Sequence, residues 1–157
     1  MLDRTDLQIL TALQEDGRMP NKEIANRVGM APSATSERMR RLREKGFIDC
    51  FETRLDEVRL GFGITAFTFV RTNELAGGKA IGISLAEIPE VQEVFNVAGE
   101  DCYLLKVRTQ DTQSLGQLLR EKVGSIEGVV STRTTIVMET FKETTRLPLL
   151  DHSVVPD

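Results

Sequence analysis

The chain has 157 residues, of which 40% are hydrophobic and 28% are charged, with 20 Lys and Arg against 24 Asp and Glu and a formal net charge of −4. This composition is close to the globular average and predicts one large domain or two small ones, which excludes wholesale disorder, a collagen-like repeat and a disulfide-dense secreted scaffold. Because Cys50 and Cys102 lie far apart and His152 is the single histidine, no zinc or redox motif is present, and we expect no metal and no cofactor.

No segment of the sequence predicts export or insertion into a membrane. Residues 1–6 are acidic where a signal peptide is basic, and the longest apolar run, at 61–70, is too short to span a bilayer. Widely spaced cysteines favour a reducing compartment. We therefore expect a cytoplasmic protein with no membrane partner.

Positive charge is concentrated in one short segment. Residues 32–46 hold five basic side chains and two acidic ones, although the chain as a whole is acidic. A local excess of positive charge is the electrostatic signature of a nucleic-acid partner, whereas an evenly spread negative total argues against one.

Three helices are predicted in the first third of the chain. The first is capped by Asp3, and the second is capped by Asn21 and ends at Gly29, which suits a left-handed C-terminal cap. The third begins at Pro32, because a first helical position needs no N–H, and it continues to about Lys45. A short helix, a glycine-containing turn and a longer basic helix predict a helix-turn-helix.

The third helix has two chemically distinct sides. Successive residues lie 100° apart, which places Thr35, Met39 and Leu42 on a stripe that suits the core. The opposite stripe offers hydroxyl groups near its N-terminal end and guanidinium groups further along, the chemistry that reads base edges in a major groove and holds phosphates. We therefore expect contacts with double-stranded DNA from Ser33, Ala34, Ser36, Glu37, Arg38, Arg40 and Arg41.

The sequence leaves the type of each contact open. Glu37 can accept a hydrogen bond from a cytosine amino group and Arg40 can contact guanine, but either can instead border phosphates. Arg38 lies beside the buried stripe, so a phosphate contact or an ion pair within the protein suits it better than a base. The alternative to DNA binding is that this charged face is only a solvated surface.

The remainder of the chain alternates strands and helices. After an extended segment at 50–55, we expect a strand at 64–71, a break at Gly77-Gly78, a helix carrying Ile81, Leu85 and Ile88, strands at 91–97 and 103–108, a helix capped by Asp111, and a long strand at 129–141. This β-α-β-β-α-β order predicts an antiparallel sheet with both helices on one face. More apolar strand surface is present than one helix layer covers, so we expect at least a homodimer that packs sheet against sheet through Phe67, Phe69, Val107, Ile136 and Val137.

The order of these motifs resembles the Lrp/AsnC (feast/famine, leucine-responsive and asparagine-responsive) family of transcriptional regulators over nearly the whole chain. Each piece alone is weakly specific, and their order and separation carry the resemblance. The N-terminal pieces are 2–6, Ile9-Leu10, Leu13, 16–18, 38–42 and 46–48, and the later pieces are Gly99, 103–107, 128–129 and 131–134.

The resemblance implies an α+β architecture: a winged-type helix-turn-helix joined by a linker strand to a ferredoxin-like sensor and assembly domain. On this basis we divide the chain into a DNA-binding domain at 1–47, a linker strand and hinge at 48–62, a ligand-sensing and oligomerisation domain at 63–142, and a C-terminal tail at 143–157. The family implies dimers that gather into octamers and a small effector, usually an amino acid, bound near contacts between dimers. The implied effector residues are Gly99, Glu100, Asp101, Cys102, Tyr103, Thr132 and Thr134.

Two departures from the family pattern stand out. The family commonly has Ser where Ala31 precedes Pro32, so a capping hydroxyl is missing, at a cost of about 1 kcal/mol. The family's Gly-x-aromatic-Asp-Tyr turn has Cys102 at the usual carboxylate position and Asp101 one residue earlier. Neighbouring residues in an extended chain point in opposite directions, so Asp101 need not replace the lost group, and the effector can differ from leucine.

An enzyme is the main alternative in a different functional class. A side branch with the same two-domain fold decarboxylates tetrapyrroles of the siroheme type with histidines in its C-terminal part, where this chain has only His152. No Ser/His/Asp or Cys/His set is present, so we expect no catalytic residues. A metabolite-binding assembly protein that no longer binds DNA is a further alternative, against which the basic cluster in the third helix argues.

Overall fold

The computed structural model describes residues 2–75 and 78–149 of the chain, in which two compact units are found. The first unit combines Met1–Arg54 with Glu143–Asp157, and the second is Leu55–Lys142. Gly77 of the predicted break and His152 lie outside the described residues. Among those described, no helix is long and apolar enough to cross a membrane.

The first unit contains the three predicted helices, α1 (Arg4–Glu15), α2 (Asn21–Val28) and α3 (Pro32–Glu44). The predicted cap of α1 is confirmed, because the Asp6 N–H donates to Asp3 Oδ1 at 2.8 Å. Gly29 ends α2 in the left-handed conformation at φ 68°, and Pro32 occupies the start of α3, both as predicted.

The predicted cap of α2 is wrong by one residue. Pro20 precedes the helix and Asn21 is its first residue, because the Asn21 side chain is used elsewhere. Its Nδ2 donates to the Pro32 carbonyl oxygen at 2.8 Å and so ties the start of α2 to the start of α3. This bond fixes the turn that the helix-turn-helix requires.

The side chains between these helices form a small core. Ile9 and Ile24 are fully buried, and Leu42 of α3 packs against them. Thr35 is also fully buried, and its hydroxyl donates to the Ala31 carbonyl oxygen at 3.1 Å. The predicted inward stripe of α3 is therefore confirmed at Thr35 and Leu42, whereas Met39 is half-buried at its edge.

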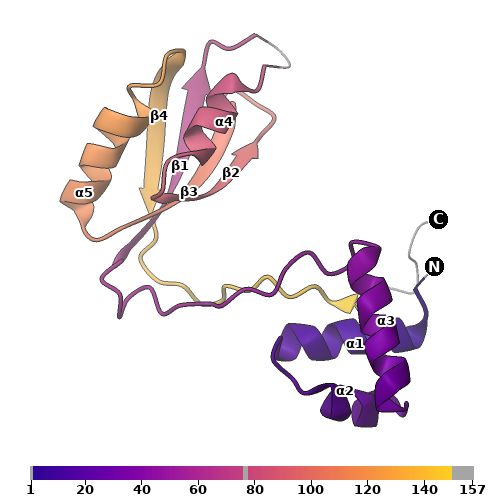
Figure 1. The fold of residues 1–157 in the computed structure, drawn as a ribbon. Coiled ribbons are helices and arrows are strands. Elements are labelled where there is room, and N and C mark those ends of the chain that lie inside the picture. Colours follow the sequence, from indigo (N-terminus) through magenta and orange to yellow (C-terminus); the bar gives the residue numbers. More distant parts are fainter. Residues whose placement is uncertain (1, 76–77, 150–157) are drawn as a thin grey trace. The chain divides into compact units, whose positions relative to one another are not determined.

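The described part of the C-terminal tail packs on the first unit (Figure 1). Gln14 of α1 binds both backbone groups of Leu147, donating to its oxygen at 3.0 Å and accepting from its N–H at 2.7 Å. Arg54 donates to Glu143, and Leu149 contacts the core between the helices. Residues 143–149 thus belong physically to the unit that carries α1–α3.

The second unit is a four-stranded antiparallel sheet with helices on one face (Figure 1). The strand order is β2-β3-β1-β4, which confirms the predicted β-α-β-β-α-β arrangement. The Asp111 cap is also confirmed, because its carboxylate accepts from the Ser114 N–H at 2.7 Å. The elements are β1 (Ile64–Thr72), α4 (Ala80–Ala86), β2 (Val91–Asn96), β3 (Tyr103–Thr109), α5 (Thr112–Gln117), the π-helical turn η1 (Leu118–Val123) and β4 (Val129–Ile136).

Two predicted extended segments are shorter than expected or absent. The last strand ends at Ile136 and not at Phe141, because Ile136 pairs with Ala66 and β1 begins only two residues earlier, at Ile64, so it offers no backbone to residues 139–141. Residues 50–55 form no strand in the described part of the chain, since a β-strand requires a partner backbone and this segment has none there.

The face of the sheet opposite the helices differs in part from the prediction. Phe67 and Phe69 lie on this open face, because the alternate residues of β1 are buried against the helices. The prediction is wrong for Val107 and Ile136, since both pair with the fully buried Ala66 and therefore lie on the helix-covered side of the sheet. Beside the phenylalanines the open face carries Leu104 and Phe95, directly opposite one another in the β2–β3 ladder.

Candidate DNA-binding and ligand-binding sites

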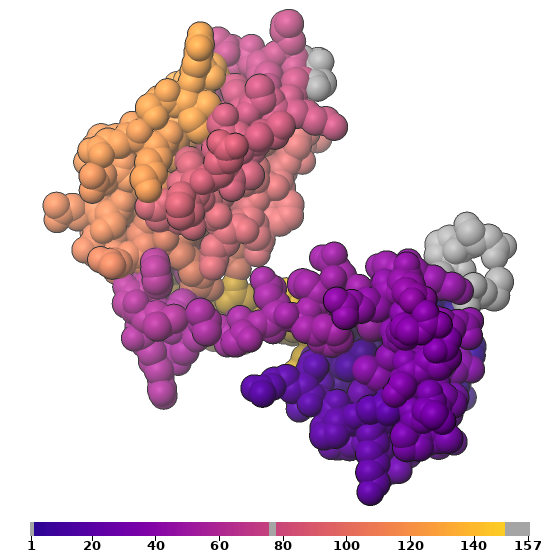
Figure 2. Space-filling view, in the orientation of Figure 1, coloured from indigo at the N-terminus to yellow at the C-terminus, as the bar shows by residue number. Residues whose placement is uncertain are grey.

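One side of α3 faces solvent over its whole length (Figure 2). Ser33, Ser36, Glu37, Arg40 and Arg41 are all exposed, as the helical stripe predicts. Ala34 is half-buried and is the member of the predicted set with the least to offer a ligand. The side that we expected to meet DNA is therefore accessible.

The N-terminal end of α3 presents free backbone donors. Ala31 precedes the helix in an extended conformation and supplies no side-chain cap, so the missing family serine is not replaced by another group of the described chain. The first N–H groups of a helix then carry partial positive charge with no partner inside the protein. An anion such as a backbone phosphate suits this position, and the hydroxyls of Ser33 and Ser36 lie beside it.

The guanidinium of Arg40 is held by two carboxylates of its own helix. It donates to Glu37 through Nε at 3.0 Å and through Nη2 at 2.5 Å, and through Nη1 to Glu44. These bonds keep the pKa of Glu37 below its ordinary value, so this side chain is an ionised acceptor at neutral pH. Glu44, the second carboxylate that holds Arg40, is not among the residues that the sequence predicts to contact DNA.

Arg38 points toward the start of α1. Its Nη1 donates to Asp3 at 2.6 Å and to Asp6 at 2.8 Å, the two carboxylates of the α1 capping box. The side chains of Arg38 and Asp6 are only 29% and 15% exposed. Of the two roles that sequence reasoning allowed for Arg38, the structure shows an ion pair within the protein.

The predicted effector turn is exposed at Gly99 and Glu100 and half-buried at Asp101 and Cys102. Gly99 adopts φ 128°, a conformation that other residues rarely take, which accounts for glycine at this position. Asp101 forms an ion pair with Arg133 of β4 at 3.0 Å. Cys102 is half-buried, and its N–H donates to the Val70 carbonyl oxygen at 3.0 Å. Glu100 is exposed, and no bond of its side chain to the described residues is found.

The other predicted effector residues face the helix-covered side of the sheet. Tyr103 is buried, and its hydroxyl donates to Glu74 at 2.8 Å. The hydroxyls of Thr134 and Thr68 are 2.9 Å apart, while Thr132 is exposed opposite Val70. The predicted set therefore divides between the two faces of the sheet, because strand residues alternate in direction and Arg133 draws Asp101 to the open face.

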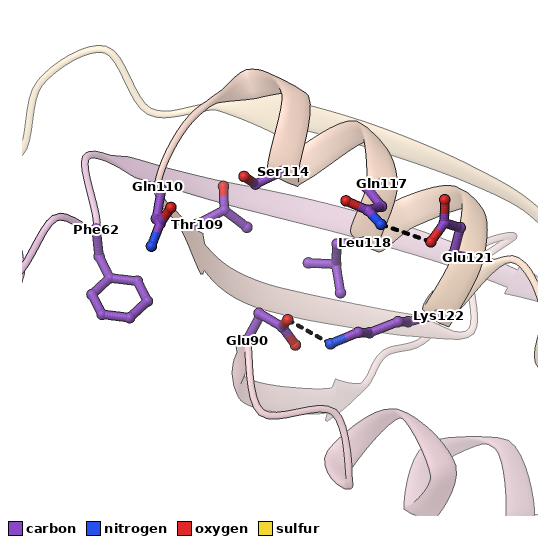
Figure 3. Close-up of a pocket in the computed structure, with 9 residues that line it drawn as sticks. All are labelled: Phe62, Glu90, Thr109, Gln110, Ser114, Gln117, Leu118, Glu121 and Lys122. Atoms are coloured by element: carbon purple, nitrogen blue, oxygen red, sulfur yellow. Dashed lines mark hydrogen bonds and ion pairs between the residues drawn. The ribbon is translucent and has the colours of Figure 1, made fainter.

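A cavity of about 330 Å³ lies elsewhere in the second unit (Figure 3). It is found at the Thr109 end of β3, whereas the predicted effector turn is at the Tyr103 end. Lys122 donates to Glu90 at 2.5 Å, which lowers the pKa of that carboxyl, and the second oxygen of Glu90 has no hydrogen-bond partner. Sequence reasoning missed this cavity because its lining comes from three separate segments: Phe62, Glu90, and a run that holds Thr109, Gln110, Ser114, Gln117, Leu118, Glu121 and Lys122.

Comparison with known proteins matches both units to characterised domain types. Residues 65–147 match the Lrp/AsnC ligand binding domain, and residues 2–49 match a winged helix-turn-helix DNA-binding domain. The HTH-type transcriptional regulator FL11 of Pyrococcus horikoshii is 39% identical over 94% of this chain and 97% of its own length. The leucine-responsive regulatory protein of Escherichia coli strain K12 is 37% identical over 93% of this chain and 90% of its own.

A solved structure extends the similarity to the fold. A transcriptional regulator of Neisseria meningitidis in complex with L-methionine has a TM-score of 0.90 and 31% sequence identity, covering 95% of this chain and 97% of its own.

Proposed function

Because the chain belongs to the Lrp/AsnC family of transcriptional regulators, which are not enzymes, we propose that it binds specific DNA sequences through α3 and responds to a small effector, an amino acid. The observation that carries the DNA-binding part is the solvent-exposed side of α3, the second helix of the helix-turn-helix. No feature of the described residues favours the tetrapyrrole decarboxylase, and the single histidine of this chain, His152, lies outside them.

In this proposal the exposed side of α3 enters the major groove. Ser33 and Ser36 lie with the free N–H groups at the helix start, where they hold a phosphate or reach a base edge. Glu37 and Arg40 lie along the centre of the stripe and face base edges, where a carboxylate accepts from cytosine and a guanidinium donates to guanine. Arg41 is exposed beside them, forms no ion pair with another described residue, and is suited to a phosphate.

The DNA interface is tested by replacing Arg40 and Arg41 together with alanine. We expect loss of specific retardation of the protein's own upstream region, with the oligomer mass unchanged. The matched control is Arg59→Ala with Arg120→Ala, which removes the same positive charge from exposed sites of the second unit and leaves binding intact. Unimpaired binding by the α3 variant contradicts the assigned face.

We further propose that the effector binds around Gly99–Tyr103, Thr132 and Thr134, at contacts between dimers. Within one chain these residues lie on both faces of the sheet and do not line the cavity beside Glu90, which agrees with a site that a second copy completes. The relative solved with L-methionine supports an amino acid as the class of ligand. With Cys102 in place of the family carboxylate, the ammonium group of the ligand needs another acceptor, and the carboxylate of the exposed Glu100 supplies one.

The open face of the second unit supports the homodimer. Phe95 is 48% exposed there, and Phe67, Phe69 and Leu104 are half-buried around it. A second copy that packs its own open face on this one buries all four side chains, and further dimer contacts lead to an octamer. Native mass measurement with and without each amino acid tests the assembly and the effector together. A monomeric mass contradicts the dimer, and the absence of any stabilising amino acid in a thermal-shift screen contradicts the effector.

A further inference from the structure

The outward stripe of α3 carries alternating charge along its centre. Glu37, Arg40 and Glu44 follow one another at spacings of three and four residues, so their side chains meet on the helix surface. The guanidinium of Arg40 donates hydrogen bonds to both of these carboxylates, and the three side chains together carry one negative charge. We call Glu37, Arg40 and Glu44 the central triad.

The free positive charge of α3 lies to either side of the central triad. At 100° per residue Arg41 and Arg43 fall on opposite flanks of the stripe, and both are exposed. Neither guanidinium forms a hydrogen bond or ion pair with another described residue. The helix thus presents a slightly negative centre between two positive edges, although residues 32–46 are basic in total.

We propose that Glu44, together with Glu37, is a specificity-determining residue that holds Arg40 away from DNA phosphates, so that Arg40 is released only where a base edge receives it. This inference rests on the proposed binding of DNA by α3. Glu44 is thereby assigned a function although it lies at the end of the helix and need not contact a base.

The physical reason is the difference between phosphates and base edges. Affinity for phosphates depends on net positive charge and is the same for every sequence, so it supplies non-specific binding. A carboxylate at the centre of the stripe repels phosphates and neutralises the arginine that would otherwise bind them. At a base pair with both a donor and an acceptor edge, Glu37 and Arg40 find replacement partners and the repulsion is offset.

The pairs of the triad are weak enough to be exchanged in this way. Glu37, Arg40 and Glu44 are 54%, 57% and 55% exposed, and exposed pairs of this kind contribute little to stability and are screened by salt. The triad therefore does not block Arg40. Separating Arg40 from its two carboxylates costs free energy, which base contacts offset at a matching sequence and not at a random one.

The test uses the full-length chain and Glu44→Gln, which keeps the size of the side chain and removes its charge. Binding is measured by fluorescence anisotropy between 50 and 200 mM KCl with two 30-base-pair duplexes, one of mixed sequence and one selected from a random pool by the unaltered protein. The matched control is Glu15→Gln in α1, which removes the same charge from a carboxylate that is also ion-paired to an arginine and is 50% exposed.

We expect Glu44→Gln to bind the mixed-sequence duplex about threefold more tightly, since one negative charge about 8 Å from a phosphate costs a factor of about two to three per phosphate. The slope of log affinity against log salt should steepen by about 0.9, the value for one additional neutralised phosphate. The preference for the selected duplex should fall by at least the same factor. Glu15→Gln should change none of these quantities.

Equal effects of Glu44→Gln and Glu15→Gln overturn the inference and show that only total charge matters, while the proposed function stands. Glu37→Gln gives an independent check, because it should weaken binding to the selected duplex as well as strengthen binding to the mixed one. If the unaltered protein enriches no duplex from the pool, the proposed function fails and this inference fails with it.

Discussion

Replacing Arg38 with methionine separates a structural role from a DNA contact. One nitrogen of Arg38 donates to both carboxylates of the α1 capping box, at 2.6 Å and 2.8 Å, so the substitution breaks the link between α3 and the start of α1. Asp6 is 15% exposed and is left without its cation, whereas Asp3 is 52% exposed and loses little. One charge-assisted bond in a mostly buried position is worth about 2 kcal/mol, which for a unit of this size is a fall in melting temperature of roughly 10 °C.

The assay can follow the two units separately because the chain has one tyrosine and no tryptophan. Tyr103 fluorescence reports the second unit, and helical circular dichroism reports mainly the first. We expect Arg38→Met to lower the stability seen by dichroism and to leave the tyrosine transition and the salt slope of DNA binding unchanged. Arg27→Met is the matched control, since Arg27 also holds two carboxylates but at exposed positions, and it should have little effect. Unaltered stability with a salt slope reduced by about 0.9 would refute the reasoning and make Arg38 a phosphate contact.

Three further predictions concern the cap, the sheet and the tail. In wild type the backbone N–H of Asp6 and the guanidinium of Arg38 keep the pKa of Asp3 below its ordinary value of 3.8. The contribution of Asp3 to the free energy of unfolding is therefore present above that pH and is lost as the pH falls through the folded-state pKa. Asp3→Asn should flatten this acid loss in a pH titration of unfolding, and an unchanged profile would contradict the assignment. Gly82→Ala places a methyl group 2.8 Å from the Tyr103 ring, so the second unit should lose about 1–3 kcal/mol in urea unfolding followed by tyrosine fluorescence, whereas full stability would show that the ring can move. Gln14→Ala removes both bonds to Leu147 and should cost the first unit about 1 kcal/mol and speed proteolysis of the tail, and equal cleavage rates would show that the tail is held by other contacts.

Local patterns in the sequence were sufficient where one element determines the structure. The Asp3 cap, the Gly29 stop, the Pro32 start and the Asp111 cap each depend on residues within one turn, and all four are found as predicted. The inward stripe of α3 follows from helical periodicity in the same way.

Predictions failed where a distant partner decides the outcome. Asn21 does not cap α2, because its side chain donates to the carbonyl oxygen of Pro32, eleven residues further along the chain. Val107 was placed on the open face, although the ladder pairs it with the buried Ala66, and no single strand reveals that register. The attachment of residues 143–149 to α1 through Gln14 depends on contacts more than 130 residues apart.

The candidate site shows the same division. The exposure of Ser33, Ser36 and Arg41 followed from the helical stripe alone. The partners of Arg38 and the cavity beside Glu90 did not, because each is assembled from segments that are separate in sequence.

The most direct measurement of the central claim is a dimethyl sulfate footprint of the unaltered protein on the duplex that it selects. Methylation at guanine N7 reports the major groove, and methylation at adenine N3 reports the minor groove. If α3 enters the major groove as two copies of a dimer, guanine N7 atoms are protected in two patches about one helical turn, roughly 10 base pairs, apart, and Arg40→Ala removes protection at specific guanines. Protection confined to adenine N3, or a guanine pattern that Arg40→Ala leaves intact, would contradict the assignment of α3 as the reading helix.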